Sequence, residues 1–424
     1  MEKQIIKNVK VSGLWGLKNI ETFFNDDVNI FVGANGTSKT TFLNLIEAVL
    51  LADFQTFIPI DFDEVKIVLG NGKIENTIRV KKRFDNYPII LYSFNGGDFL
   101  EVVYPEFVRR GMVRSVRMLG DYQVIKDKLA ELVNISWLSV HRENNQNDEY
   151  ERVHERTHNY VDEKLNDLMR KLTIYQLQLE SEASKIADKF KEDIFSLMLY
   201  DEDVDKVNIQ SFEHFNPDEI KNELLRAYDL LGINVKDKNK RIIKHTDKLQ
   251  NVINIIKEGK MLDVEDIFSL SLINRTLSLI SISKENEEKK QQIFNPISVY
   301  LKLLKDFMPE KEFKLDKDSS GELEIYLKNK KSKGKKIPLF SLSSGEKQLI
   351  ILFTETLLQK NEPYLFITDE PELSLHIDWQ RRIIETLRKL NTNAQITVAT
   401  HSPEIAGKWK QSVTNMENIT NYDE

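Results

Sequence analysis

VNIFVGANGTSKTTFLNLIEAVLLA, residues 28–52, joins a short apolar run to a small-residue loop and then to an amphipathic segment. The apolar run fits a buried strand, and apolar residues recurring every three or four positions predict a helix. A loop between a strand and a helix N-terminus presents free backbone N–H groups to an anion. The stretch therefore predicts a phosphate-binding loop at residues 33–40.

The side chains of this loop suit a nucleotide. Lys39 is placed to reach the β- and γ-phosphates, and the Thr40 hydroxyl is placed to ligate Mg²⁺. One position departs from the pattern G-x-x-x-x-G-K-[ST], because Ser38 stands where glycine is expected. The alternative is a strand-to-helix turn with an incidental lysine. The candidate nucleotide-binding residues here are Gly33, Asn35, Gly36, Ser38, Lys39, Thr40 and Thr41.

Composition excludes several classes of function. The chain has 424 residues, 67 acidic and 60 basic, for a net charge of -7, which disfavours general coating of nucleic acid. Cysteine is absent, so disulfides, cysteine nucleophiles and iron–sulfur clusters are excluded. No run of 18 apolar residues is present, and the first residues lack the apolar core of a signal peptide. We expect a cytoplasmic protein without a membrane partner.

Three further motifs carry polar chemistry. The strand YLFIT ends at Asp369 and Glu370, where one carboxylate can hold Mg²⁺ and the next can polarise the attacking water. The strand QITVAT ends at His401, which can contact a γ-phosphate. LSSGE, residues 342–346, offers hydroxyls and N–H groups at a helix start. Alone, an acidic strand end, a strand-end histidine and a helix cap each have an ordinary structural explanation.

The order of segments indicates one α/β head interrupted by a helical insertion. Strands and helices alternate before residue 145 and after residue 308, with a parallel sheet expected at residues 364–400. Apolar residues from Val161 to Leu197 recur every three or four positions, which predicts one long helix. We therefore assign residues 1–145 plus 308–424 to the head and residues 146–307 to the insertion. No long heptad array is present, so an extended coiled-coil arm is not expected.

The order of the phosphate loop, insertion, LSSGE, acidic strand end and histidine resembles the ABC/SMC class of ATPases. The resemblance implies an α/β fold: a P-loop ABC-type ATPase head with a mostly helical insertion. Such a head binds ATP and Mg²⁺. It also implies a head-to-tail dimer, or a larger assembly of such dimers, with two composite sites. Each site combines Lys39, Thr40, Asp369, Glu370 and His401 of one chain with Ser344, Gly345 and Glu346 of the other.

The Q-loop of this class is the least defined motif. It is expected after the strand that ends near Val140, where His141-Arg142-Glu143 stands instead. Gln146 is the nearby candidate for this residue and for a metal ligand. The other candidate metal ligands are Thr40 and Asp369, and the candidate catalytic residues are Glu370 and His401.

Within the class, DEPELSLHIDWQ and LSSGEKQL look most similar to OLD-type (overcoming-lysogenization-defect) ATPases and their antiphage relatives, PtuA of Septu systems and AriA of PARIS systems. The first 50 and last 90 residues carry this resemblance. OLD proteins continue into a Toprim nuclease domain, whereas 23 residues follow His401 here. We therefore expect any nuclease to be a separate chain.

The resemblance implies an ATP-driven switch of slow turnover in antiphage defence. The expected partners are a second copy, a nuclease or toxin effector and a phage protein as trigger, with nucleic acid left open. The first alternative is a DNA-repair ATPase of RecF/SMC type that binds DNA in an ATP-dependent way. A transporter cassette would need a membrane partner, and Ser38 raises the further alternative of a chain that binds ATP without hydrolysing it.

Two other patterns have plainer explanations. His154-Glu155-Arg156-Thr157-His158 matches HExxH, but its polar surroundings and the lack of a third ligand disfavour a zinc site. The lysine-rich link at residues 328–336 reads as a basic hairpin tip, which is a solvated turn or a contact for nucleic-acid phosphates.

Overall fold

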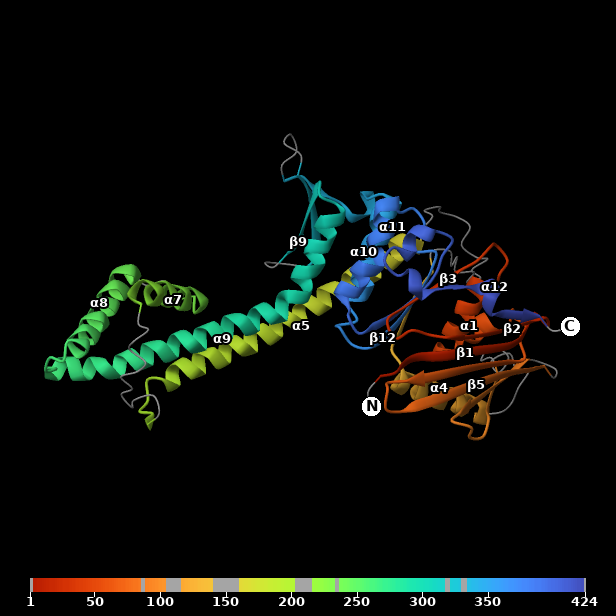
Figure 1. The fold of residues 1–424 in the computed structure, drawn as a ribbon, viewed down its shortest axis with the longest axis horizontal. Coiled ribbons are helices and arrows are strands. Elements are labelled where there is room, and N and C mark those ends of the chain that lie inside the picture. Colours follow the sequence, from red (N-terminus) through yellow and green to blue (C-terminus); the bar gives the residue numbers. More distant parts are fainter. Residues whose placement is uncertain are drawn as a thin grey trace. The chain divides into compact units, whose positions relative to one another are not determined.

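The computed structural model describes residues 3–84, 88–103, 116–139, 160–202, 216–232, 236–316, 321–328 and 334–422 (Figure 1). Unit 1 consists of Met1–Thr173 with Val299–Glu424, and unit 2 consists of Ile174–Ser298. The sequence placed these boundaries at residues 145 and 308. The difference arises because two long helices continue through both boundaries, so their ends nearest the ATPase motifs belong to unit 1.

Unit 1 contains the predicted parallel sheet. Its order is β14-β3-β13-β12-β8, and every neighbouring pair is parallel. The carboxyl ends of parallel strands meet at one edge of the sheet, which is where α/β proteins place ligands. The strands are β3 (Val28–Val32), β8 (Ile135–Ser139), β12 (Tyr364–Asp369), β13 (Ala394–Ala399) and β14 (Val413–Asn415).

A second, seven-stranded sheet of antiparallel pairs has the order β15-β2-β1-β4-β5-β6-β7. Helix α1 (Lys39–Leu51) is buried in a core shared with both sheets, because Phe42 and Ile46 join Val9 of β1 and Ile367 of β12 in one apolar cluster. The strands are β1 (Ile5–Leu14), β2 (Lys18–Phe23), β4 (Glu64–Gly70), β5 (Glu75–Phe84), β6 (Pro88–Phe94), β7 (Leu100–Val103) and β15 (Thr420–Tyr422), and the accompanying helices are α2 (Phe54–Phe57), α4 (Val116–Leu132) and α12 (Met416–Ile419).

Helices α10 (Ser344–Leu357) and α11 (Ile377–Leu390) contact each other in unit 1. The end of α9 (Val264–Phe307) packs on them: the Tyr300 and Thr354 hydroxyls lie 2.8 Å apart, both fully buried, and the Phe307 ring meets Phe353 edge-on. Strands β9 (Lys311–Leu315), β10 (Leu323–Leu327) and β11 (Lys336–Ile337) form a small antiparallel sheet. The predicted hairpin is thus present, although residues 329–333 at its tip lie outside the described ranges.

The part of α9 in unit 2 lies beside α5 (Tyr160–Ser196), and Figure 1 shows the two running together. The predicted apolar stripe of α5 is largely buried, as Leu179 and Phe190 illustrate within unit 2. The pairing of two such long helices was not expected, because the sequence showed no heptad array. Helices α7 (Pro217–Leu230) and α8 (Lys238–Lys257) complete the unit.

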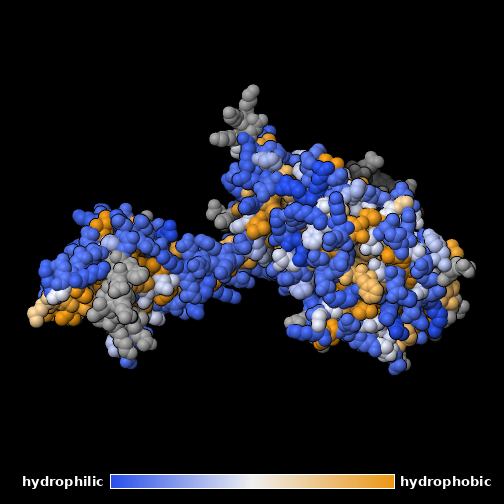
Figure 2. Space-filling model, viewed as in Figure 1, coloured by the Kyte–Doolittle hydropathy of each residue, from blue (hydrophilic) through white to orange (hydrophobic). Residues whose placement is uncertain are grey.

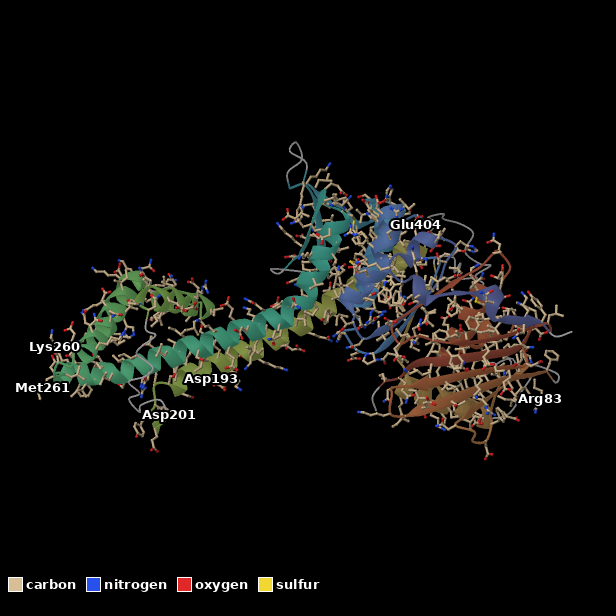
Figure 3. The ribbon with its side chains drawn as sticks, viewed as in Figure 1. Arg83, Asp193, Asp201, Lys260, Met261 and Glu404 are labelled. Carbon is tan, nitrogen blue, oxygen red and sulfur yellow. The ribbon has the colours of Figure 1, made fainter. Side chains whose placement is uncertain are left out.

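Unit 2 exposes apolar side chains where α8 meets α9, the region of Met261 in Figures 2 and 3. Met261 is fully exposed, and Val264, Ile267 and Phe268 are each more than half exposed. Contiguous exposed apolar residues commonly mark a contact surface in proteins. No helix within the described ranges is both long and apolar enough to cross a lipid bilayer.

Candidate nucleotide site

The phosphate-binding loop connects β3 to α1, as predicted. Gly36 and Ser38 both adopt positive φ angles, 82° and 69°, which turn the chain tightly before α1 begins at Lys39. Such turns aim successive backbone N–H groups toward one point, and the N-terminus of α1 adds its partial positive charge. The loop therefore has the geometry of an anion site.

Ser38 occupies the left-handed conformation that the expected glycine would adopt freely. A residue with a side chain pays about 1–2 kcal/mol for this backbone. Part of that cost is offset because the Ser38 hydroxyl accepts a hydrogen bond from the Lys18 ammonium at 3.1 Å. Lys18, on β2, also donates to the carbonyl of Gly36 at 3.3 Å.

We expect Ser38→Gly to stabilise the protein by about 1 kcal/mol, because relief of the strained backbone outweighs the lost hydrogen bond. Thermal unfolding of Ser38→Gly and Ser38→Ala should separate the two effects. Ser38→Ala keeps the strained φ and loses the hydroxyl, so its melting temperature should fall. A glycine variant that melts as low as the alanine variant would contradict the strain argument.

Lys39 lies folded into the loop. Its ammonium donates to the carbonyls of Gly33 at 2.7 Å and Ala34 at 3.1 Å, and the residue is only 5% exposed. Burial lowers the pKa of Lys39, and the nearby carboxylates of Asp369, Glu370 and Glu372 oppose that shift. A buried cation at the N-terminus of α1 fits a phosphate group.

The acidic strand end and the histidine lie together at the carboxyl edge of the parallel sheet. Asp369 closes β12 and is buried, and Glu370 follows it with φ 47°, a strained backbone for a residue with a side chain. The Glu370 N–H donates to the carbonyl of Ala399 at 2.8 Å, which fixes this backbone against β13. One Glu370 carboxylate oxygen lies 3.7 Å from Nε2 of His401. The two candidate catalytic residues, Glu370 and His401, therefore lie close together.

The donor set at this edge fits Mg²⁺. A hydroxyl from the exposed Thr40 and a carboxylate from the buried Asp369 are hard oxygen ligands, which Mg²⁺ prefers when it also binds phosphates. Among the described residues, no cluster of three acidic or histidine side chains forms a metal site by protein ligands alone. Gln146, His141 and the HExxH pattern lie outside the described residues.

The LSSGE motif begins α10 with a capping box. Ser343 accepts from the N–H of Glu346, and the Glu346 carboxylate accepts from the N–H of Ser343 at 3.0 Å. An ion pair also holds the Glu346 carboxylate 2.5 Å from the Lys311 ammonium, and the pKa of Glu346 is lowered although burial opposes that shift. Glu346 is thus engaged in ordering the helix start, while Ser344 is exposed. That Ser344, Gly345 and Glu346 contact the nucleotide held by a second copy stays a prediction.

Gly345 brings this motif against the segment after β12. A Cβ atom at Gly345 would lie 2.3 Å from the carbonyl oxygen of Ser374, so no other residue fits without displacing that backbone. Ser374 itself has φ 65°. The Ser374 backbone is therefore in direct contact with the LSSGE motif of its own chain.

Sequence reasoning missed two residues at this site. Lys18 is contributed by β2 and contacts the phosphate loop, which no local motif could indicate. Glu372 is 9% exposed and accepts three hydrogen bonds from the segment containing His401. The available signal was the third acidic residue of DEPE, an unusual charge three residues after the end of a buried strand.

Curated relatives share part of this sequence. The probable ATPase of retron Ec83 from Escherichia coli is 35% identical over 80 residues, covering 16% of this chain and 15% of that protein. The probable ATPase of retron Vc95 from Vibrio cholerae serotype O1 biovar El Tor is 25% identical over 179 residues, covering 37% of this chain and 34% of that protein. The matched regions thus span about a third or less of either relative.

Solved structures of SMC heads align along nearly the whole chain at low identity. The Smc head domain of Pyrococcus furiosus with an extended coiled coil, bound to the C-terminal domain of ScpA, gives a TM-score of 0.45 at 15% identity, covering 99% of this chain and 96% of that one. The SMC head domain from Thermotoga maritima gives 0.40 at 12% identity, covering 100% and 98%.

The α/β head with a helical insertion predicted from the sequence is the fold observed. The family model described as the AAA ATPase domain matches residues 5–406, nearly the entire chain. With the phosphate loop, Asp369 and Glu370 meeting at one sheet edge, the chain belongs to the AAA ATPase domain family and is an ATPase.

Proposed function

We propose that this ATPase is a switch in which two copies close head-to-tail around ATP and control a separate nuclease or toxin in defence against phages. The observation that carries the proposal is the openness of both halves of the site. Asn35, Thr40 and His401 are exposed at one half, and Ser344 is exposed at the other. Small-molecule sites usually bury most of their ligand. A second copy would supply the missing cover.

The residues have distinct tasks in hydrolysis. Lys39 and the loop N–H groups bind phosphate oxygens, and Asp369 with Thr40 holds the cation that balances charge on the transferred group. Glu370 orients the attacking water and takes its proton, as general base. His401, next to Glu370, contacts the terminal phosphate. Turnover should be slow, because the useful product of such a switch is a conformation.

The assignment to defence rests on sequence similarity. DEPELSLHIDWQ and LSSGEKQL resemble OLD-type ATPases and the PtuA and AriA proteins, and the curated relatives above are named as ATPases of retrons. The separate effector follows from the resemblance to PtuA and AriA. A phage protein is the proposed trigger, and Mg-ATP is the proposed ligand of the closed state.

A pull-down from the native locus tests this function. Glu370→Gln protein, tagged and supplied with Mg-ATP, should hold the closed state and retain a stoichiometric nuclease or toxin, identified by mass spectrometry. Lys39→Ala protein is the matched control, because it cannot hold the nucleotide and should retain less of the same effector. Recovery of a membrane permease, or of DNA with repair factors and no toxin, would contradict the proposal.

A further inference from the structure

Glu372 ties the two catalytic segments of unit 1 together. It lies two residues after Glu370, on the turn that leaves β12, and is 9% exposed. Its Oε1 atom accepts hydrogen bonds from the Thr400 hydroxyl at 2.5 Å, the His401 N–H at 3.0 Å and the Ser402 N–H at 3.2 Å. A single carboxylate oxygen thus gathers three donors from the loop after β13.

These donors lie just beyond the end of a strand. Strand β13 ends at Ala399, so the N–H groups of His401 and Ser402 are past its ladder and need other partners. The Ser402 N–H is shared between Glu372 and the Thr400 hydroxyl, which lies 2.9 Å away. Thr400 is fully buried, and its N–H donates to the Phe31 carbonyl of β3 at 3.0 Å. The hydrogen bonds of the sheet therefore hold the chain as far as Thr400, and the Glu372 side chain holds the residues that follow.

A second link holds the same loop. The Ser402 hydroxyl donates to the Gln380 side-chain oxygen at 2.7 Å, and the Gln380 amide donates to the Leu375 carbonyl at 2.9 Å. Gln380 belongs to α11, directly after the segment that touches Gly345. The His401 loop is thereby held from both ends of residues 372–380.

We propose that Glu372 is a positioning residue for hydrolysis, which sets the place of His401 relative to Glu370 through its hydrogen bonds to residues 400–402. The inference rests on the roles proposed above for Glu370 and His401. The distance of 3.7 Å between His401 Nε2 and Glu370 Oε1 is then a consequence of this tether. Displacement of catalytic groups by about 1 Å can cost about 100-fold in rate.

Steady-state ATPase kinetics of the full chain test the proposal. Glu372→Ala should lower kcat by about 10- to 100-fold while KM for Mg-ATP changes less than about threefold, because the hydrogen bonds that hold Lys39 in the phosphate loop go to Gly33 and Ala34 and not to Glu372. Glu372→Gln keeps one acceptor oxygen and should recover part of the rate. Thr400→Val removes one tether donor at nearly constant volume, so it provides a milder second variant if Glu372→Ala folds poorly.

Glu404→Gln is the matched control. Glu404, labelled in Figure 3, lies in the 3₁₀ turn Pro403–Ala406 after His401, and its carboxylate accepts from the Arg381 guanidinium at 2.6 Å instead of from the His401 loop. This variant should keep the wild-type kcat. If Glu404→Gln lost as much rate as Glu372→Ala, the loss of any carboxylate near this loop would have the same effect. That result would overturn the role proposed for the hydrogen bonds of Glu372 to residues 400–402.

A double-mutant cycle separates the tether from the roles on which it rests. If Glu372 acts through His401, Glu372→Ala should cost little more once His401→Ala is present, so the two losses are not additive. Full additivity overturns the tether while leaving His401 in the site. Wild-type rates for His401→Ala would overturn both the role of His401 and the tether, whereas normal rates for Glu372→Ala alone would overturn only the tether.

Discussion

Replacing Glu370 with glutamine should lower the rate of ATP hydrolysis by about 10²- to 10⁴-fold, the usual contribution of a general base. Glutamine has nearly the same shape but cannot accept the proton of the attacking water. Nucleotide binding should persist, because Lys39 and the loop N–H groups are unchanged. The backbone N–H of residue 370 also keeps its hydrogen bond to the carbonyl of Ala399. The affected quantity is therefore kcat, with little change in affinity.

Phosphate release with Mg-ATP measures the rate, and a fluorescent ATP analogue measures affinity. Glu362→Gln is a suitable control, because Glu362 is an exposed carboxylate beside the opposite, amino end of β12, near Asn134. It should hydrolyse ATP normally. Glu370→Gln protein that turns over as fast as the wild type would remove Glu370 as the base and leave Asp369 or His401 to be tested next.

The elements around the nucleotide site could be predicted because their signals are local. Strand β12 is largely buried, so its sequence is a short apolar run that ends in polar residues. Strand β13 is buried throughout, although Gln395 and Thr397 alternate with its apolar residues. The start of α1 follows from the loop before it. The edge of the sheet where the motifs meet then follows from parallel strand direction alone.

What could not be predicted depends on contacts between distant segments. Glu372 and His401 are 29 residues apart and meet only because β12 and β13 are neighbours. Helix α4 offered little periodicity, since Ile125 and Leu129 are the two buried apolar positions among its described side chains. The sequence showed that Ser38 replaces a glycine, which indicates backbone strain. It did not show that Lys18 is the hydrogen-bond partner of Ser38, because β2 approaches the loop only in the folded chain.

Mixing two inactive variants should restore hydrolysis if the site is shared between copies. Lys39→Ala removes the phosphate-binding cation, and Ser344→Arg places a bulky charge on the exposed start of α10. Each alone should lose at least about 100-fold in rate, as loss of one preorganised group at the transferred phosphate typically does. Neither change touches the buried core, apart from the Lys39 stem, so both proteins should fold.

In an equimolar mixture, half of the dimers contain one copy of each variant. One composite site of such a dimer carries both defects, and the other pairs an intact phosphate loop with an intact LSSGE motif. The mixture should therefore recover up to about a quarter of the wild-type rate, given random pairing in a two-fold symmetric dimer. Recovery that rises with protein concentration would identify association as the limiting step. A mixture no faster than its components would contradict a composite site. A fully active Ser344→Arg protein would show that each chain hydrolyses ATP without its partner. The exposed half-sites would then lack the function proposed for them.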